Sequence, residues 1–178
     1  NEEIILMVKG WHENADSSES KNFKEVLMNR TGSGYTLLQD AVKKGDKEVI
    51  EMVRGLYDTP GLLEHSDFET ILMNRTEDGF TLLQHAVTSG KKEIILMVKE
   101  WYEKADLLET DDFRFKILLN VTNHGFNICH HLGLSKIDED TVNSIFELIK
   151  EEDQIRLLSQ KTKNGYLPGS SSNKGVQS

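Results

Sequence analysis

The sequence predicts an all-α fold made of repeated helical units, and an internal copy is the first reason. Met28–Val42 reads MNRTGSGYTLLQDAV, and 45 residues later Met73–Val87 reads MNRTEDGFTLLQHAV. The glycine of this stretch recurs in steps of 45, 46 and 40 residues, at Gly34, Gly79, Gly125 and Gly165. The apolar residues of each copy also follow a helical spacing. A period of this size is typical of solenoid proteins, in which each unit buries its apolar side against its neighbours.

The first helix of each copy is expected to begin just after the turn glycine and its aromatic neighbour. Thr36 and Gln39 have the spacing of a capping box, and Thr81 and Gln84 repeat it. The apolar residues of this helix share one face, namely Leu37, Leu38, Ala41 and Val42. The glycines that follow them, Gly45 and Gly90, stand where glycine commonly ends a helix.

A second and a third helix are expected in each copy. The second, Lys47–Tyr57, aligns with Lys92–Tyr102 and with Glu2–His12, and each segment has one apolar stripe. The pair Thr59-Pro60 has the form of an N-cap followed by a proline in the first helical position. Ser66 and Glu69 then show capping-box spacing ahead of further apolar residues, Phe68, Ile71 and Leu72.

The chain therefore reads as one array over residues 1–168. It contains a partial first repeat (1–33), repeats that begin at 34, 79 and 125, and a degenerate end (161–168). Residues 169–178 are small and polar, which predicts a disordered tail or a linker.

The repeat pattern, G-[YF]-T-L-L-Q-x-A-V-x-x-G-x-K-E-[VI]-I, resembles the ankyrin repeat, G-x-T-P-L-H-x-A-A-x-x-G-H-x-E-V-V. The resemblance covers Gly34–Ile50, Gly79–Ile95 and, more loosely, Gly125–Ile149. Leucine replaces the family's proline and glutamine its histidine in the first two copies. The period of 45 exceeds the family's, which is about 33. The resemblance thus implies an ankyrin-like solenoid with an extra helix per repeat, like some arthropod and intracellular-bacterial proteins. HEAT and armadillo repeats, which have a similar period but lack this glycine turn, are the second choice.

The charge balance disfavours nucleic acids and membrane surfaces as partners. The net charge of -9 disfavours a generic nucleic-acid binder or a polybasic membrane-surface protein, and it favours a partner with a basic surface. The longest apolar run, Ile4–Val8, is too short to span a membrane. The single cysteine, Cys129, cannot form an internal disulfide, so a cytoplasmic (intracellular) location is predicted.

The densest polar cluster is NHGFNICHH (Asn123–His131), which could suggest a metal site. Its register argues otherwise, because Cys129 aligns with Leu38 and Leu83, which are predicted core positions. His130 falls on the histidine that the ankyrin resemblance implies to be structural. The chain has no cysteine pair that could supply zinc-ligand spacing, and no hydrolase, protease or phosphate-loop motif is present. We therefore predict no metal, no cofactor, no catalytic residue and no enzymatic activity.

Three glycosylation sequons begin at Asn29, Asn74 and Asn120. They fall at one position of the repeat. They are interpreted as a copied repeat position rather than as sites of modification.

Two groups of residues are candidate partner contacts. Tyr35, Phe80 and Phe126 follow the turn glycines, where the ankyrin resemblance implies a concave binding face; the alternative is that the extra helix covers these rings as core. Beside them, the first helix varies between copies at positions expected to face solvent. These residues are Asp40 and Lys43 in one copy, His85 and Thr88 in the next, and His131 in the third.

The function expected from these features is non-catalytic recognition of a protein partner. One alternative is a targeting or regulatory array of a larger enzyme, toxin or effector. The other is a structural spacer or oligomerisation array. The sequence does not identify the partner.

Overall fold

The computed structural model describes residues 17–170, and within them it is built of helices and turns. The all-α prediction is confirmed. The expected helix over residues 2–12 and residues 171–178 of the predicted tail lie outside the described residues. The helices are α2 (Ser17–Met28), α3 (Leu37–Lys44), α4 (Lys47–Tyr57), α5 (His65–Leu72), α6 (Leu82–Thr88), α7 (Lys92–Lys104), α8 (Asp111–Phe113), the π-helix η1 (Arg114–Leu118), α9 (Ile128–Leu134), α10 (Glu139–Phe146) and α11 (Glu151–Ser159).

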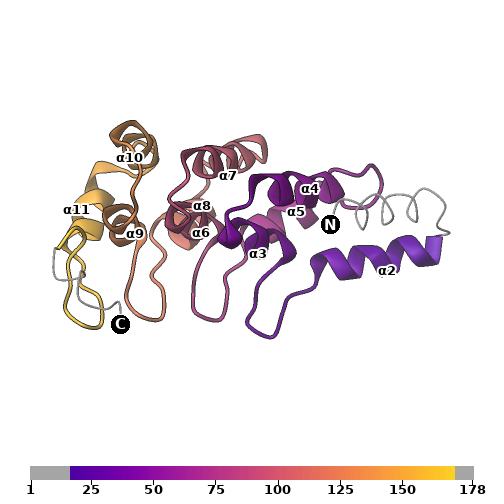
Figure 1. The fold of residues 1–178 in the computed structure, drawn as a ribbon, viewed down its shortest axis with the longest axis horizontal. Helices are drawn as coiled ribbons and strands as arrows, with labels where there is room; N and C mark the ends of the chain where they lie inside the picture. Colours follow the sequence, from indigo (N-terminus) through magenta and orange to yellow (C-terminus); the bar gives the residue numbers. More distant parts are fainter. Residues whose placement is uncertain (1–16, 171–178) are drawn as a thin grey trace.

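The helices are arranged in parallel rows along an elongated molecule (Figure 1). The helices α3, α6 and α9 form one row, and each packs against the next. The row of α4, α7 and α10 covers one edge of it, while the loops that precede α3, α6 and α9 project from the opposite edge (Figure 1). We call α3, α6 and α9 the first helices, α4, α7 and α10 the second helices, and α2, α5, α8 with η1, and α11 the third helices.

The first helices begin at the predicted caps. The Thr36 hydroxyl accepts a hydrogen bond from the Gln39 backbone N–H at 3.2 Å, and the Gln39 side chain accepts one from the Thr36 N–H. Thr81 and Gln84 repeat this capping box. Gly45 ends α3 with φ 69°, a left-handed conformation that favours glycine. In α6 the C-cap is Ser89 rather than the predicted Gly90, which follows with φ 67°.

The predicted start of the third helix is wrong. Residues 58–64 form turns, so Thr59 does not cap a helix; its hydroxyl donates to the Gly55 carbonyl at 3.1 Å instead. The helix begins later, with a reciprocal cap between Glu64 and Asp67 in place of the expected Ser66–Glu69 box. Several polar residues in this segment have capping spacing, and the packing of Leu62 into the core fixes the later start.

A single inserted residue explains why the second glycine step is 46 and not 45. Phe113 lies 45 residues after Phe68, and each contacts a second-helix tyrosine, with ring centroids 4.8 Å and 6.0 Å apart. Ile117, by contrast, lies 46 residues after its counterpart Ile71. The extra residue therefore falls inside η1, because a π-turn accommodates one more residue than an α-turn.

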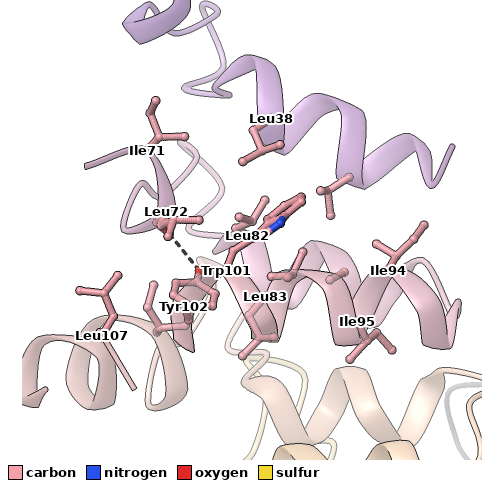
Figure 2. Packing of buried hydrophobic residues seen from close by; sticks show 14 of the residues in the cluster. Leu38, Ile71, Leu72, Leu82, Leu83, Ile94, Ile95, Trp101, Tyr102 and Leu107 are labelled. Carbon is pink, nitrogen blue, oxygen red and sulfur yellow. Dashed lines mark hydrogen bonds between the residues drawn. The ribbon is translucent and has the colours of Figure 1, made fainter. Parts of the chain in front are cut away.

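The core runs continuously between the units. Leu38, Leu82, Leu83 and Ile95 are fully buried, together with Leu72 and Tyr102 (Figure 2). The Tyr102 hydroxyl donates to the Leu72 carbonyl at 2.9 Å, and Tyr57 makes the same contact with Leu27 one unit earlier, at 3.3 Å.

One predicted apolar residue, Leu37, is more exposed than expected, and another, Trp11 of the expected helix over residues 2–12, lies outside the described residues. Leu37 is 41% exposed, whereas its counterpart Leu82 is fully buried, because Leu82 has α3 in front of it and no first helix precedes Leu37 within the described residues. Trp101 is buried. No helix within residues 17–170 is long and apolar enough to cross a membrane.

Candidate functional site

The three loops before the first helices and the loop that follows α11 are hairpin turns of one design. In each, a threonine hydroxyl accepts a hydrogen bond from the backbone N–H of the aromatic residue four positions later. The pairs are Thr31 and Tyr35, Thr76 and Phe80, Thr122 and Phe126, and Thr162 and Tyr166, at 3.0 to 3.1 Å. The glycine before each aromatic residue has φ between 78° and 87°. Glycine is favoured there because other residues rarely adopt this conformation.

Backbone hydrogen bonds join each hairpin to the next. The N–H groups of Glu77, Asn123 and Lys163 donate to carbonyls of the preceding hairpin, those of Ser33, Asp78 and His124, at 2.9 to 3.0 Å. The hairpins pack so closely that a Cβ on Gly34 would lie 2.9 Å from the Glu77 nitrogen. This regular contact fixes the spacing of the residues that follow the hairpins.

The sequon asparagines Asn74 and Asn120 also connect the units. The Asn74 side chain donates to the Gly34 carbonyl at 2.9 Å and to the Gln39 side chain, and Gln39 donates to the Asn74 carbonyl at 2.9 Å. Asn120 makes the same contacts with Gly79 and Gln84. Both asparagines are buried, which is the burial expected of a structural repeat position and leaves no room for a glycan.

The predicted aromatic and histidine positions form a continuous stack of rings. His85 lies between Tyr35 and Phe80, with centroid distances of 5.3 Å and 4.9 Å. His131 lies between Phe80 and Phe126, at 5.1 Å and 5.7 Å. Tyr35, Phe80 and Phe126 are half-buried, so each ring belongs partly to the surface and partly to the contact between units. We call these five residues the ring stack.

The prediction that His85 and His131 face solvent is wrong. Their exposed fractions are 3% and 5%, and the Nε2 atom of each has no hydrogen-bond partner among residues 17–170. Burial lowers the pKa of both imidazoles to about 4, with a smaller contribution from Lys43 and His131 at His85 and from His130 at His131. The neutral rings therefore serve as flat apolar spacers between the hairpin aromatics.

The other predicted contacts lie at the surface beside the ring stack. Lys43 is exposed; its ammonium donates to the Tyr35 hydroxyl at 2.8 Å and lies 4.5 Å from the ring centroid. Asp40 is half-buried and pairs with Lys44 at 2.6 Å. Thr88 is exposed, and its hydroxyl donates to carbonyls of its own helix.

The polar cluster at Asn123–His131 has structural roles. Burial raises the pKa of the Cys129 thiol to about 11, as expected of a core position. The His130 ring takes the place of glutamine in the cap with Asn127 and faces the Tyr166 carbonyl at 3.2 Å. No group of three or more histidine, cysteine or acidic residues with the geometry of a metal site occurs within residues 17–170.

A comparison of the chain with models of known protein families, with curated proteins and with solved structures finds no match. The case for a function therefore rests on the geometry above. Sequence reasoning missed the alternation of imidazole and aromatic rings, although a signal for it existed. His85 and His131 occupy one register position, five residues after an aromatic residue, in two successive copies.

Proposed function

We propose that this chain is an ankyrin-like solenoid, enlarged by a third helix per repeat, that recognises a protein partner without catalysis. Its recognition face would consist of the half-buried rings of Tyr35, Phe80 and Phe126 and the exposed residues of the first helices. The hydrogen bonds between hairpins support this proposal, because they hold these residues at a fixed spacing before any partner arrives. Such preorganisation reduces the entropic cost of binding.

The observation that carries the proposal is the division between copied and divergent positions. On the first helices, the positions that are the same in the first two copies are buried at the contacts between units, as Leu38 and Leu83 are, with the exception of the partly exposed Leu37. The exposed positions on the same helices differ: Lys43 becomes Thr88 and then Leu134. A common frame with a different surface in each copy is suited to recognising one particular partner.

Site-specific photocrosslinking tests the proposal. A photoreactive amino acid is placed at Lys43, Thr88 or Leu134 on the first helices, and the chain is irradiated in cell lysate. The matched control places it on the second helices, at the exposed residues Glu51, Glu100 or Asn143. We expect one adduct of the same mass from the first-helix positions and none from the second-helix positions.

The opposite pattern would refute the proposed face. Equal labelling from both rows would indicate non-specific collisions, because the second helices lie along one edge of the molecule and the first helices lie between them and the projecting loops (Figure 1). Circular dichroism of each labelled chain verifies that the substitution has not unfolded it.

A further inference from the structure

Ion pairs close two of the contacts between neighbouring third helices. Lys24 of α2 pairs with Asp67 of α5 at 2.6 Å, and Arg114 of η1 pairs with Asp153 of α11 at 2.7 Å. The two carboxylates are well covered, with exposed side-chain fractions of 17% and 8%. The hydrogen bond from Lys24 also lowers the pKa of Asp67. In each contact, a cation from one unit fills the space beside an acid of the next unit.

The contact between α5 and α8 lies between these two, and among the described residues no ion pair crosses it. Glu69 pairs with His65 of its own helix at 3.3 Å, and Lys116 of η1 lines the space beside Asp112. Glu69 stands 45 residues after Lys24 and 45 before Arg114, and Asp112 stands 45 after Asp67. Two carboxylates therefore occupy the positions of an ion pair. Asp112 is 67% exposed, in contrast to its covered counterparts, and pairs only along its own helix, with Lys116. Exposed pairs of this kind contribute little to stability and are easily exchanged.

This contact is hollow, and the cavity beside Arg114 in the next contact is smaller, at about 230 Å³. Two adjoining cavities, of about 500 Å³ and about 620 Å³, are both lined by Glu69, Leu107 and Asp112. Asn74 lines the first cavity; it is only 4% exposed, and its Oδ1 atom accepts no hydrogen bond within the described residues. A buried amide oxygen without a partner is costly, so a ligand that donates an N–H there gains stability.

We propose that this groove binds an arginine side chain of a basic protein partner, in the place that Lys24 and Arg114 take in the neighbouring contacts. A guanidinium carries five N–H donors in a planar fork, enough to bond Glu69, Asp112 and the free oxygen of Asn74 together. Arg114 shows the same behaviour within this chain, because it bonds both Asp153 and Glu152. The chain's net charge of -9 attracts such a partner from a distance.

The charges around the groove also orient the bound segment. Arg30 and Arg75 line the cavity on the hairpin side, whereas Asp106 and Asp111 line the second cavity on the far side. A second cation of the partner is favoured only toward the aspartates, and an acidic residue only toward the arginines. This groove belongs to the third helices, so it is separate from the recognition face proposed above and is tested independently of it.

The test is a titration of the isotope-labelled chain, followed by backbone amide shifts in NMR spectra. The probe is the peptide acetyl-glycyl-arginyl-glycine amide. The control is the same peptide with citrulline, which keeps the shape of arginine but has no charge. We expect saturable shifts around Glu69, Asn74 and Asp112 with the arginine peptide and none with the citrulline peptide.

Two matched variants exchange the ion-pair pattern between contacts. Glu69→Lys places a lysine where Lys24 stands one unit earlier, so it fills the groove and weakens peptide binding at least about tenfold. Lys24→Glu removes the cation from the first contact and creates a second set of shifts around Asp67. Should Glu69→Lys fail to fold, Glu69→Gln replaces it and is expected to weaken binding several-fold.

Three results would overturn the proposal. The first is equal shifts with the arginine and citrulline peptides. The second is unchanged binding by a folded Glu69→Lys chain. The third is the absence of new shifts around Asp67 in a folded Lys24→Glu chain.

Discussion

The imidazole of His85 stacks on the ring of Phe80, with centroids 4.9 Å apart and an angle of 13° between the planes. The two residues belong to one hairpin and its first helix, and the Tyr35 ring of the preceding unit closes the other side of the imidazole. The stack therefore links residues of the proposed recognition face to the packing between neighbouring units.

Removing this imidazole is expected to destabilise the chain. His85→Ala leaves a gap among buried rings, and we expect the free energy of unfolding to fall by about 2 kcal/mol or more. Thr88→Ala, three residues on in the same helix but exposed, should change it by less than about 0.5 kcal/mol. Urea unfolding of both variants measures the difference, and equal effects would mean that the stack contributes little.

Acid should loosen the ring stack through both of its histidines. Their pKa is about 4 in the folded chain against an ordinary value of 6.5, so the unfolded chain binds more protons between these pH values. Stability from the neutral rings is thus complete above pH 6.5 and is lost as the pH falls through 4, with an upper limit of about 3 kcal/mol for each histidine.

The control for this pH effect is the double variant His85→Phe and His131→Phe. Phenylalanine keeps a flat ring, cannot be protonated, and removes two buried nitrogen atoms that have no hydrogen-bond partner in the described part of the chain. Urea unfolding at pH 7 and pH 4.5 should show that the free energy of unfolding falls less on acidification for the variant than for the natural chain. A loss of equal size would assign the pH dependence to carboxylates instead.

The sequon asparagines give a comparison within one motif. Asn74→Ala removes the side-chain donor to the Gly34 carbonyl and one of the donors to the Gln39 side chain, which should cost about 2 kcal/mol of unfolding free energy. Asn29→Ala changes the exposed asparagine of the first copy, whose side chain accepts a hydrogen bond from the neighbouring Arg30 N–H, so the free energy of unfolding should change by less than about 1 kcal/mol. Thermal unfolding distinguishes the two, and a larger effect at Asn29 would contradict the structural role of Asn74.

Close packing of the hairpins predicts that alanine substitutions at Gly125 and Gly165 destabilise the chain by different amounts, although the two glycines have nearly equal φ. A Cβ on Gly125 would lie 2.8 Å from the Lys163 nitrogen, whereas a Cβ on Gly165 meets nothing within 4 Å. Gly165→Ala should therefore show only the left-handed backbone cost, about 1 kcal/mol. Gly125→Ala should lower the free energy of unfolding clearly more, because the two hairpins must also move apart to make room for the Cβ atom. Comparable melting temperatures for the two variants would show that the hairpins can move apart at little cost in free energy.

Local signals in the sequence predicted local structure well. The Thr36–Gln39 and Thr81–Gln84 caps form as expected because both partners lie within one helical turn. The same kind of signal failed at Thr59-Pro60, where a longer turn positions Leu62 in the core and the helix starts after it. Where several residues could cap a helix, tertiary packing selects one of them. The spacing of two residues in the sequence carries no information about that packing.

The candidate sites depended on contacts between units, and there the sequence was less informative. His85 varies between copies, as a surface residue would, yet the neighbouring hairpin covers it. The charge pattern of Lys24, Glu69 and Arg114 was visible at a spacing of 45 residues. Its meaning required knowing that Asp67, Asp112 and Asp153 face these positions from the next unit.

The hydrogen bonds that join the units connect only neighbours and span no more than 48 residues of sequence among the described residues. The chain therefore needs no closure of very long loops when it folds, and structure can spread from whichever unit forms first. Under a pulling force applied to its two ends, such a chain should extend in successive steps, one unit at a time, rather than in a single rupture.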